Sequence, residues 1–143
     1  MRNCADAYTT LTVQAEVSNL PDVLEFVDTE LESVGCDMKT QMMIEIAAEE
    51  LYTNIAKYAY EPGTGEAVIR IRHLEDPKAV EITFEDSGIP YDPLAKEDPD
   101  VTMPAEEREI GGLGIFMVKK SMDDISYEYK NGQNILKIKK NIA

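Results

Sequence analysis

Tryptophan is absent from this chain of 143 residues, and histidine and cysteine are scarce. The single histidine, His73, and the two cysteines, Cys4 and Cys36, are too few to predict a zinc site or a disulfide framework. No apolar run approaches the ~20 residues that cross a bilayer, and the first residues lack the apolar segment of a secretory signal. We therefore expect a cytoplasmic protein that does not enter a membrane.

Basic residues are also few. The chain has 14 Lys and Arg against 28 Asp and Glu, which gives a formal net charge of −14. Such a charge repels nucleic acid and anionic membranes, so we expect no direct binding to either. Two interpretations stay open: the charge keeps the protein soluble, or it speeds the approach of a basic protein partner.

What the chain does have is an ordinary globular composition, with 43% hydrophobic and 29% charged residues. Its length suits one domain over residues 1–143, without repeats or linkers. A Thr- and Val-rich stretch at residues 8–17 predicts a first strand. A helix should follow, with Asn19 or Ser18 as its cap, Pro21 at its first position and Gly35 at its end.

The longest helix is expected over residues 38–60, with Asp37 as its cap. Two strands at 67–73 and 79–85 should then form an antiparallel hairpin. The apolar positions expected to face the core from the long helix are Met43, Ile46, Ala47, Leu51, Ile55 and Ala59.

Residues 89–110 have no steady period and contain four prolines and seven acidic residues, which predicts a lid or binding loop. Helical spacing returns at 113–122, and Asn131-Gly132 predicts a final hairpin. This order predicts an α+β two-layer sandwich, with a mixed, mostly antiparallel sheet covered on one face by three helices.

Three segments carry residues suited to chemistry. On the long helix, Glu50 and Asn54 are four residues apart and therefore lie on one face. An amide oxygen is a suitable ligand for Mg²⁺, and a carboxylate one turn away can accept a proton from a nucleophile. The alternative is a solvated polar face.

The second segment, Asp86-Ser87-Gly88, ends an apolar strand. A carboxylate in a pocket can accept a hydrogen bond from an exocyclic amine such as that of adenine, and a glycine permits close approach of a ring. A plain strand-ending turn is the alternative.

The third segment, residues 111–114, has the sequence Gly-Gly-Leu-Gly and opens a helix. Free N–H groups at a helix N-terminus can bind phosphate, and glycines let the phosphate come close. The alternative is a flexible hinge for the lid. A Walker loop is excluded because no Gly-Lys-Ser/Thr sequence follows.

In this order the three segments resemble the N box, G1 box and G2 box of the superfamily that joins gyrase, histidine kinases and MutL (GHKL, the Bergerat ATP-binding fold). The resemblance spans residues 8–138. The chain length and the ending GGLGIFMVKKSMDDISYEYKNGQNILKIKK look most like the bacterial anti-sigma-factor serine/threonine kinases.

The resemblance implies a role for each matching residue, with ATP and Mg²⁺ as cofactors. Glu50 would be the general base and Asn54 would coordinate Mg²⁺, while Lys57 could reach a phosphate. The adenine end would be formed by Asp86, which accepts from the amine, and Gly88, which leaves room for the ring. The triphosphate would lie along Gly111, Gly112, Leu113 and Gly114.

Two positions depart from the family pattern. Many relatives have a His four residues after the metal-binding Asn, where this chain has Tyr58, and some have an Arg where it has Ile110. Arg108 is the nearest basic residue to that position. These departures concern phosphoryl transfer rather than nucleotide binding.

The resemblance implies a kinase that phosphorylates a STAS-type anti-anti-sigma protein and sequesters a partner such as a sigma factor, and that forms a homodimer as relatives do. The main alternative is a non-catalytic binding module gated by ATP. A stand-alone ATPase is disfavoured because gyrase-type enzymes carry further domains. A histidine-kinase fragment is disfavoured because no dimerisation hairpin is present.

Overall fold

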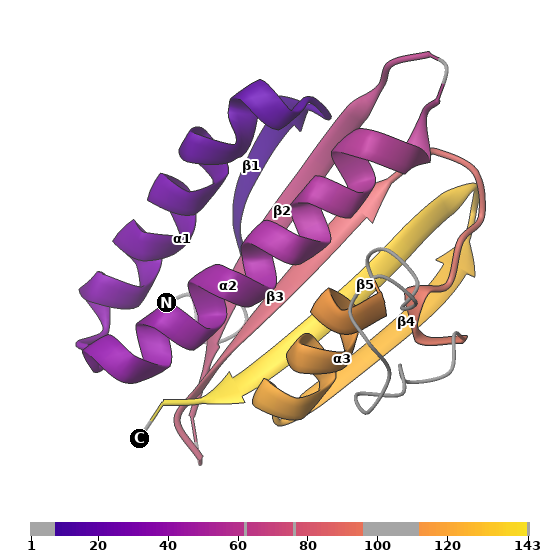
Figure 1. Ribbon diagram of the computed structural model, residues 1–143. Helices are drawn as coiled ribbons and strands as arrows, with labels where there is room; N and C mark the ends of the chain where they lie inside the picture. The colour runs from indigo at the N-terminus through magenta and orange to yellow at the C-terminus, as the bar shows by residue number, and fades with distance from the viewer. Residues whose placement is uncertain (1–7, 62, 76, 96–111, 143) are drawn as a thin grey trace.

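The computed structural model describes residues 8–61, 63–75, 77–95 and 112–142. Its five strands and three α-helices follow one another in the order β-α-α-β-β-α-β-β (Figure 1). They are β1 (Thr9–Gln14), α1 (Leu20–Ser33), α2 (Met38–Asn54), β2 (Glu66–Leu74), β3 (Ala79–Asp86), α3 (Gly112–Ser121), β4 (Asp124–Lys130) and β5 (Gln133–Asn141).

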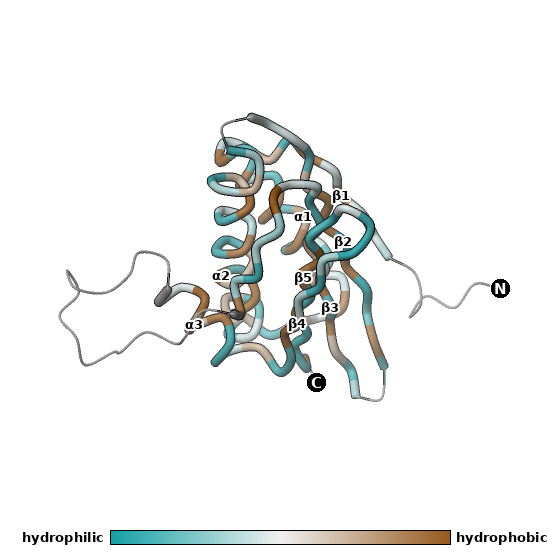
Figure 2. Tube along the Cα trace, turned by 90° about the vertical axis from the view of Figure 1, so that its right-hand side faces the viewer, coloured by the Kyte–Doolittle hydropathy of each residue, from teal (hydrophilic) through white to brown (hydrophobic). Residues whose placement is uncertain are grey.

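The strands form one sheet in the order β1-β2-β3-β5-β4, and the helices cover one of its faces (Figures 1 and 2). This confirms the two-layer α+β arrangement. The expected mixed sheet is corrected in one respect, because every pairing among the described strands is antiparallel. The reason is that β5 returns beside β3 in the opposite direction and so leaves no parallel neighbour.

Helix α1 packs on the sheet through Val23, Val27 and Leu31, which are fully buried. Gly35 follows the helix with φ of +71°, a left-handed conformation that suits glycine. Asn19 occupies the N-cap position, but its side chain donates to the Gln14 carbonyl at 2.9 Å and does not cap the helix.

Helix α2 begins as expected, since the Asp37 side chain accepts from the Thr40 N–H at 2.8 Å. The expectation for Ile46 is wrong, because it is 59% exposed. At 100° per residue it lies on the opposite side of the helix from the residues that face the sheet. Those buried residues are Ile44, Ala47, Ala48, Leu51 and Tyr52.

The end of the long helix differs from expectation in shape. A π-helical turn covers Ile55–Ala59 directly after α2. Such wider turns occur as short insertions in α-helices and are frequent at functional sites. Here the turn carries Ala59 to the end of β3, where the Ile89 N–H donates to the Ala59 carbonyl at 3.0 Å.

The final hairpin turns at Asn131 and Gly132 as predicted. Both have positive φ, at 54° and 79°, which is the conformation that a two-residue hairpin turn requires. Strand β5 places Leu136 and Ile138 in the core, next to β3. No described helix has the length and apolar character needed to cross a membrane.

Candidate functional site

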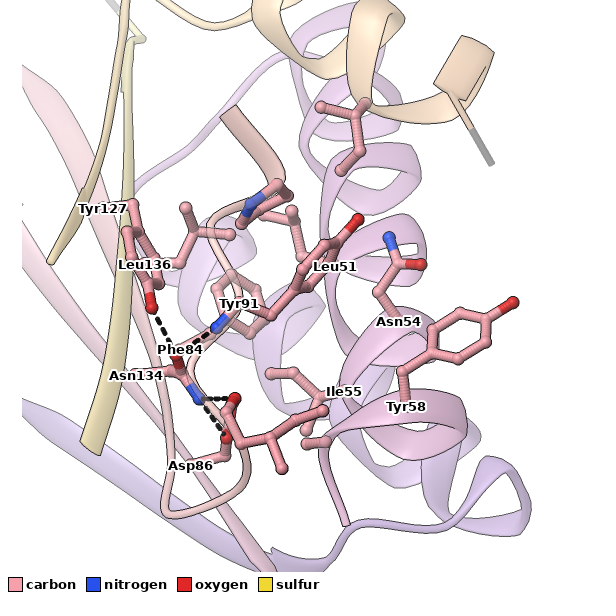
Figure 3. A pocket seen from close by; sticks show the side chains of 14 residues that line it. Leu51, Asn54, Ile55, Tyr58, Phe84, Asp86, Tyr91, Tyr127, Asn134 and Leu136 are labelled. Carbon is pink, nitrogen blue, oxygen red and sulfur yellow. Dashed lines mark hydrogen bonds between the residues drawn. The ribbon is translucent and has the colours of Figure 1, made fainter. Parts of the chain in front are cut away.

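A cavity of about 390 Å³ lies between the end of α2, the end of β3, the start of β5 and the start of α3 (Figure 3). Its volume is within the usual range for small-ligand pockets. The wall is mainly apolar with a few polar side chains, and it is formed by Leu51, Asn54, Ile55, Tyr58, Ala59, Phe84, Asp86, Ile89, Tyr91, Pro93, Ile115, Tyr127, Asn134 and Leu136.

Two buried polar side chains lie on the sheet side of this cavity. Asp86 and Asn134 are opposite each other in the β3–β5 register. Asp86 Oδ1 accepts from Asn134 Nδ2 and from the Gly88 N–H, each at 2.9 Å. Asp86 Oδ2 has no hydrogen-bond partner among the described residues. This oxygen can accept a hydrogen bond, so it suits a ligand that brings a donor.

Gly88 is explained by packing against the protein itself. A Cβ at this position would overlap the carbonyl group and the side chain of Ala59. The absence of a side chain therefore lets the chain after β3 lie directly on the π-helical turn. The expected role, room for a ligand ring, stays a prediction.

Glu50 and Asn54 lie on the helix side of the cavity, one turn apart on α2. Asn54 Nδ2 donates to Glu50 Oε2 at 2.9 Å. The Glu50 carboxyl group also contacts the start of α3, because a Cβ on Gly114 would overlap it. The structure thus brings together the Glu50/Asn54 pair and Gly114, which the sequence predicted in separate segments.

The other predicted residues are placed less closely around the cavity. Lys57 is exposed on the π-helical turn and is not part of the cavity wall, whereas Tyr58 lines it and is 47% exposed. Gly112 and Leu113 form the start of α3. Gly111, Arg108, Ile110 and most of the expected lid at 89–110 lie outside the described residues.

The residues present fit a magnesium nucleotide better than a metal held by the protein alone. The described part of the chain has no group of three or more His, Cys, Asp or Glu side chains that could hold a metal ion. The Asn54 amide oxygen has no partner among the described residues, since the hydrogen bond to Glu50 uses the amide nitrogen. Mg²⁺ commonly takes one or two protein ligands together with phosphate oxygens and water.

Asn134, Tyr127 and Tyr91 are cavity residues that sequence reasoning missed. The Tyr127 hydroxyl donates to Asn134 Oδ1 in a short hydrogen bond, and burial raises the pKa of Tyr127. The alternation of β4 and β5 marks Tyr127 and Asn134 as core-facing, which is the one signal available. A polar residue at a core-facing position of a strand deserves a functional explanation.

The histidine kinase-like ATPase domain family matches residues 13–140 of this chain. That match covers the three α-helices, strands β2, β3 and β4, nearly all of β5 and both sides of the cavity. The chain belongs to this family. Its resemblance to GHKL proteins is therefore confirmed.

Within this family, the chain is similar to the serine-protein kinases called RsbW. It is 33% identical over 100 residues to the RsbW of Bacillus cereus strain AH187, which covers 67% of this chain and 61% of that protein. The RsbW of Listeria monocytogenes is 30% identical over 100 residues, covering 67% of this chain and 63% of that protein. The chain thus spans less than two thirds of the length of these relatives.

A solved structure supports the fold. The crystal structure of the RsbU and RsbW domains of a Mycobacterium tuberculosis protein matches 95% of this chain and 32% of that one, with a TM-score of 0.67. The sequence identity is 15%, so the likeness concerns the family fold alone. ATP is the cofactor that membership of an ATPase family implies.

Proposed function

We propose that this protein is an ATP-dependent serine/threonine kinase of the anti-sigma-factor type. The observation that supports this proposal most is the position of two groups of residues. Glu50, Asn54 and Gly114 cluster on the helix side of the cavity, and Asp86 lies on the sheet side. A nucleotide with its base at Asp86 would have its phosphates near the start of α3. Kinases of this kind need positioning and charge neutralisation more than covalent chemistry.

Each residue would act on one part of the reaction. Mg²⁺, when bound with the nucleotide, neutralises charge on the phosphates, and Asn54 would hold it through its amide oxygen. Glu50 would take the proton from the attacking seryl or threonyl hydroxyl. Its hydrogen bond to Asn54 would keep the base beside the metal ligand.

The proposed substrate and partners are supported by the similarity to RsbW proteins, which are named serine-protein kinases. The substrate would be a STAS-type anti-anti-sigma protein, and the sequestered partner would be a regulatory protein such as a sigma factor. The net charge of −14 would favour a partner with a basic surface. We also propose a cytoplasmic location and a homodimer for this protein.

The test uses Mg-ATP labelled on the γ-phosphate, incubated with the protein and an extract of its own cells. A small labelled protein that appears with wild type and not with Glu50→Gln would support the kinase. The matched control is Glu49→Gln, because Glu49 is an exposed neighbour that points about 100° away on the same helix.

A second candidate is an ATP-gated binding module without catalysis. Tyr58 favours it, since this residue occupies the position of a His in many serine-kinase relatives and lines the cavity. In that case ATP would bind with no transfer of label to any protein. Partner binding would then change with ATP while the labelled product stays absent.

A further inference from the structure

The side chain of Asn134 lines the cavity on its sheet side and is almost completely buried, with 7% exposed. It lies opposite Asp86 on the neighbouring strand and faces the side covered by helices. Polar side chains in such places are retained when their hydrogen bonds are satisfied.

All the hydrogen-bonding capacity of the Asn134 amide is in use (Figure 3). The Nδ2 group donates to Asp86 Oδ1 at 2.9 Å and to the Ile89 carbonyl at 2.8 Å. The Oδ1 atom accepts from the Tyr91 N–H at 3.1 Å and from the Tyr127 hydroxyl. A flipped amide would place acceptor against acceptor at Asp86 and at the Ile89 carbonyl, and donor against donor at the Tyr91 N–H, so only one orientation is possible.

This fixed orientation determines the chemistry of Asp86. Asp86 Oδ1 receives two donors, from Asn134 and from the Gly88 N–H. The other oxygen is left to the cavity as an acceptor. A base with an amino group beside it can donate, whereas a base with an oxo group would place acceptor against acceptor.

We propose that Asn134 is a positioning residue that makes the site select 6-amino purine nucleotides over 6-oxo purine nucleotides. It would do so by occupying Asp86 Oδ1 and so leaving Asp86 Oδ2 as the acceptor toward the cavity. The same amide is hydrogen-bonded to the backbone at Ile89 and Tyr91. Asn134 would therefore position both the group that contacts the base and the chain that follows β3. This inference rests on the proposed binding of ATP in this cavity.

A simpler role for Asn134 is to satisfy buried polar groups and so to stabilise the fold. Loss of that role would weaken the binding of all nucleotides by the same factor. The ratio of affinities for ATP and ITP separates the two roles, because these nucleotides differ only in the 6-amino or 6-oxo group and in the proton that the 6-oxo base carries on the adjacent N1. A site that uses a hydrogen bond to the amine should prefer ATP by about 10-fold or more.

The decisive variant is Asn134→Asp, which keeps the shape and replaces the donor to Asp86 by an oxygen. Two carboxyl groups at hydrogen-bond distance share a proton, and a protonated carboxyl group can donate to a 6-oxo group. We expect the ATP:ITP affinity ratio of N134D to fall at least about 10-fold at pH 6 and to recover partly at pH 8. The ratio of wild type should stay constant over this range.

The other titratable groups around Asp86 are Tyr60, Tyr127 and Asp92. Burial raises the pKa of both tyrosines above the ordinary value of 10.0, so neither tyrosine changes charge between pH 6 and pH 8. All three groups are present in wild type and in N134D. A pH dependence seen in the variant alone therefore belongs to the new carboxyl pair.

Tyr127→Phe is the matched control, since it removes a hydrogen bond to Asn134 and leaves both donors to Asp86 in place. Its affinity can fall, but its ATP:ITP ratio should equal that of wild type. If N134D does not fold, Asn134→Leu has a similar volume and no charge, and its ratio should also fall.

The outcomes are distinguishable by equilibrium titration with ATP and ITP. A lower ratio in N134D or N134L, with an unchanged ratio in Y127F, supports the inference. Equal weakening of both nucleotides in N134D or N134L overturns it and leaves the proposed ATP site intact. If wild type binds neither nucleotide, the proposed function fails and the inference fails with it.

Discussion

The two sides of the cavity are built in different ways. The sheet side is a closed hydrogen-bond network in which Asp86, Asn134 and the backbone after β3 hold one another. The helix side depends on one side-chain hydrogen bond, between Asn54 and Glu50, and on contact with Gly114. The site proposed for the base thus has a hydrogen-bonded support, whereas the groups proposed for chemistry rest on two helices that meet at one glycine.

This contrast agrees with the demands of the two tasks. Discrimination between bases depends on donors and acceptors held in fixed positions. Phosphoryl transfer requires groups that close around the nucleotide and its substrate. Substitutions on the helix side should therefore affect transfer most, and substitutions near the sheet should affect affinity and stability.

The largest effect should come from Glu50→Gln, on the helix side. Removing the proposed base while keeping the side-chain shape should lower phosphate transfer by about 10²- to 10⁴-fold. ATP affinity should change little, because the hydrogen bond to Asn54 can still form. Single-turnover transfer and ATP titration measure the two quantities. Equal transfer by E50Q and Glu49→Gln would contradict the assignment of Glu50.

Asn54→Ala should have the next largest effect. Loss of the amide ligand should weaken the affinity for Mg-ATP by about 10- to 100-fold, as expected for a hydrogen-bonding group that contacts a charge. The effect should be small for ATP in the presence of EDTA, which serves as the control. An equal loss with and without Mg²⁺ would place Asn54 outside the metal site.

On the sheet side, Gly88→Ala should act on stability. The added Cβ would overlap the Ala59 backbone, and overpacking of this kind costs about 1–3 kcal/mol. Thermal unfolding should show a lower Tm by about 3–8 °C. Ser87→Ala is the control, since Ser87 is exposed and should change little. An unchanged Tm for G88A would show that the turn moves aside freely.

The smallest effect should come from Glu45, outside the cavity. Its pKa is raised from 4.5 to about 7, mainly by a hydrogen bond with Asp28 and then by burial. The folded state therefore holds a proton that the unfolded state releases, so stability should fall as pH rises from about 4.5 to 7. Glu45→Gln should reduce this fall in Tm by about 2–5 °C between pH 5 and pH 8.

Thermal unfolding at several pH values gives the comparison for Glu45. Glu25→Gln, an exposed acidic residue on α1, is the control and should keep the slope of wild type. A slope for E45Q equal to that of wild type would place the pH dependence elsewhere. Such a result would leave both sides of the cavity unaffected.

Local signals predicted most of the fold. Asp37 caps α2, Asn131-Gly132 forms the final turn, and the strands of the central hairpin lie within a residue of their expected positions. These features depend on neighbours in sequence. The exposure of Ile46 was missed because apolar residues occur around much of α2, so periodicity alone did not identify the face that meets the sheet.

The cavity was predicted only in part, for a similar reason. Glu50, Asn54, Asp86 and Gly114 stand in recognisable motifs. The structure places Asn54 and Asp86 in the cavity wall, and Glu50 next to Asn54 and Gly114. Asn134 is 48 residues from Asp86 in sequence, and its role exists only because β5 pairs with β3. The π-helical turn that brings Ala59 to Gly88 likewise depends on contacts distant in sequence.

Titration of Mg-ATP against wild type and Asp86→Asn by calorimetry tests the central claim most directly, namely that an adenine nucleotide binds in this cavity with its base at Asp86. We predict one site on wild type and an affinity at least about 10-fold weaker for Asp86→Asn, with its fold retained. Absence of binding to wild type, or equal affinity of the two proteins, would contradict the claim.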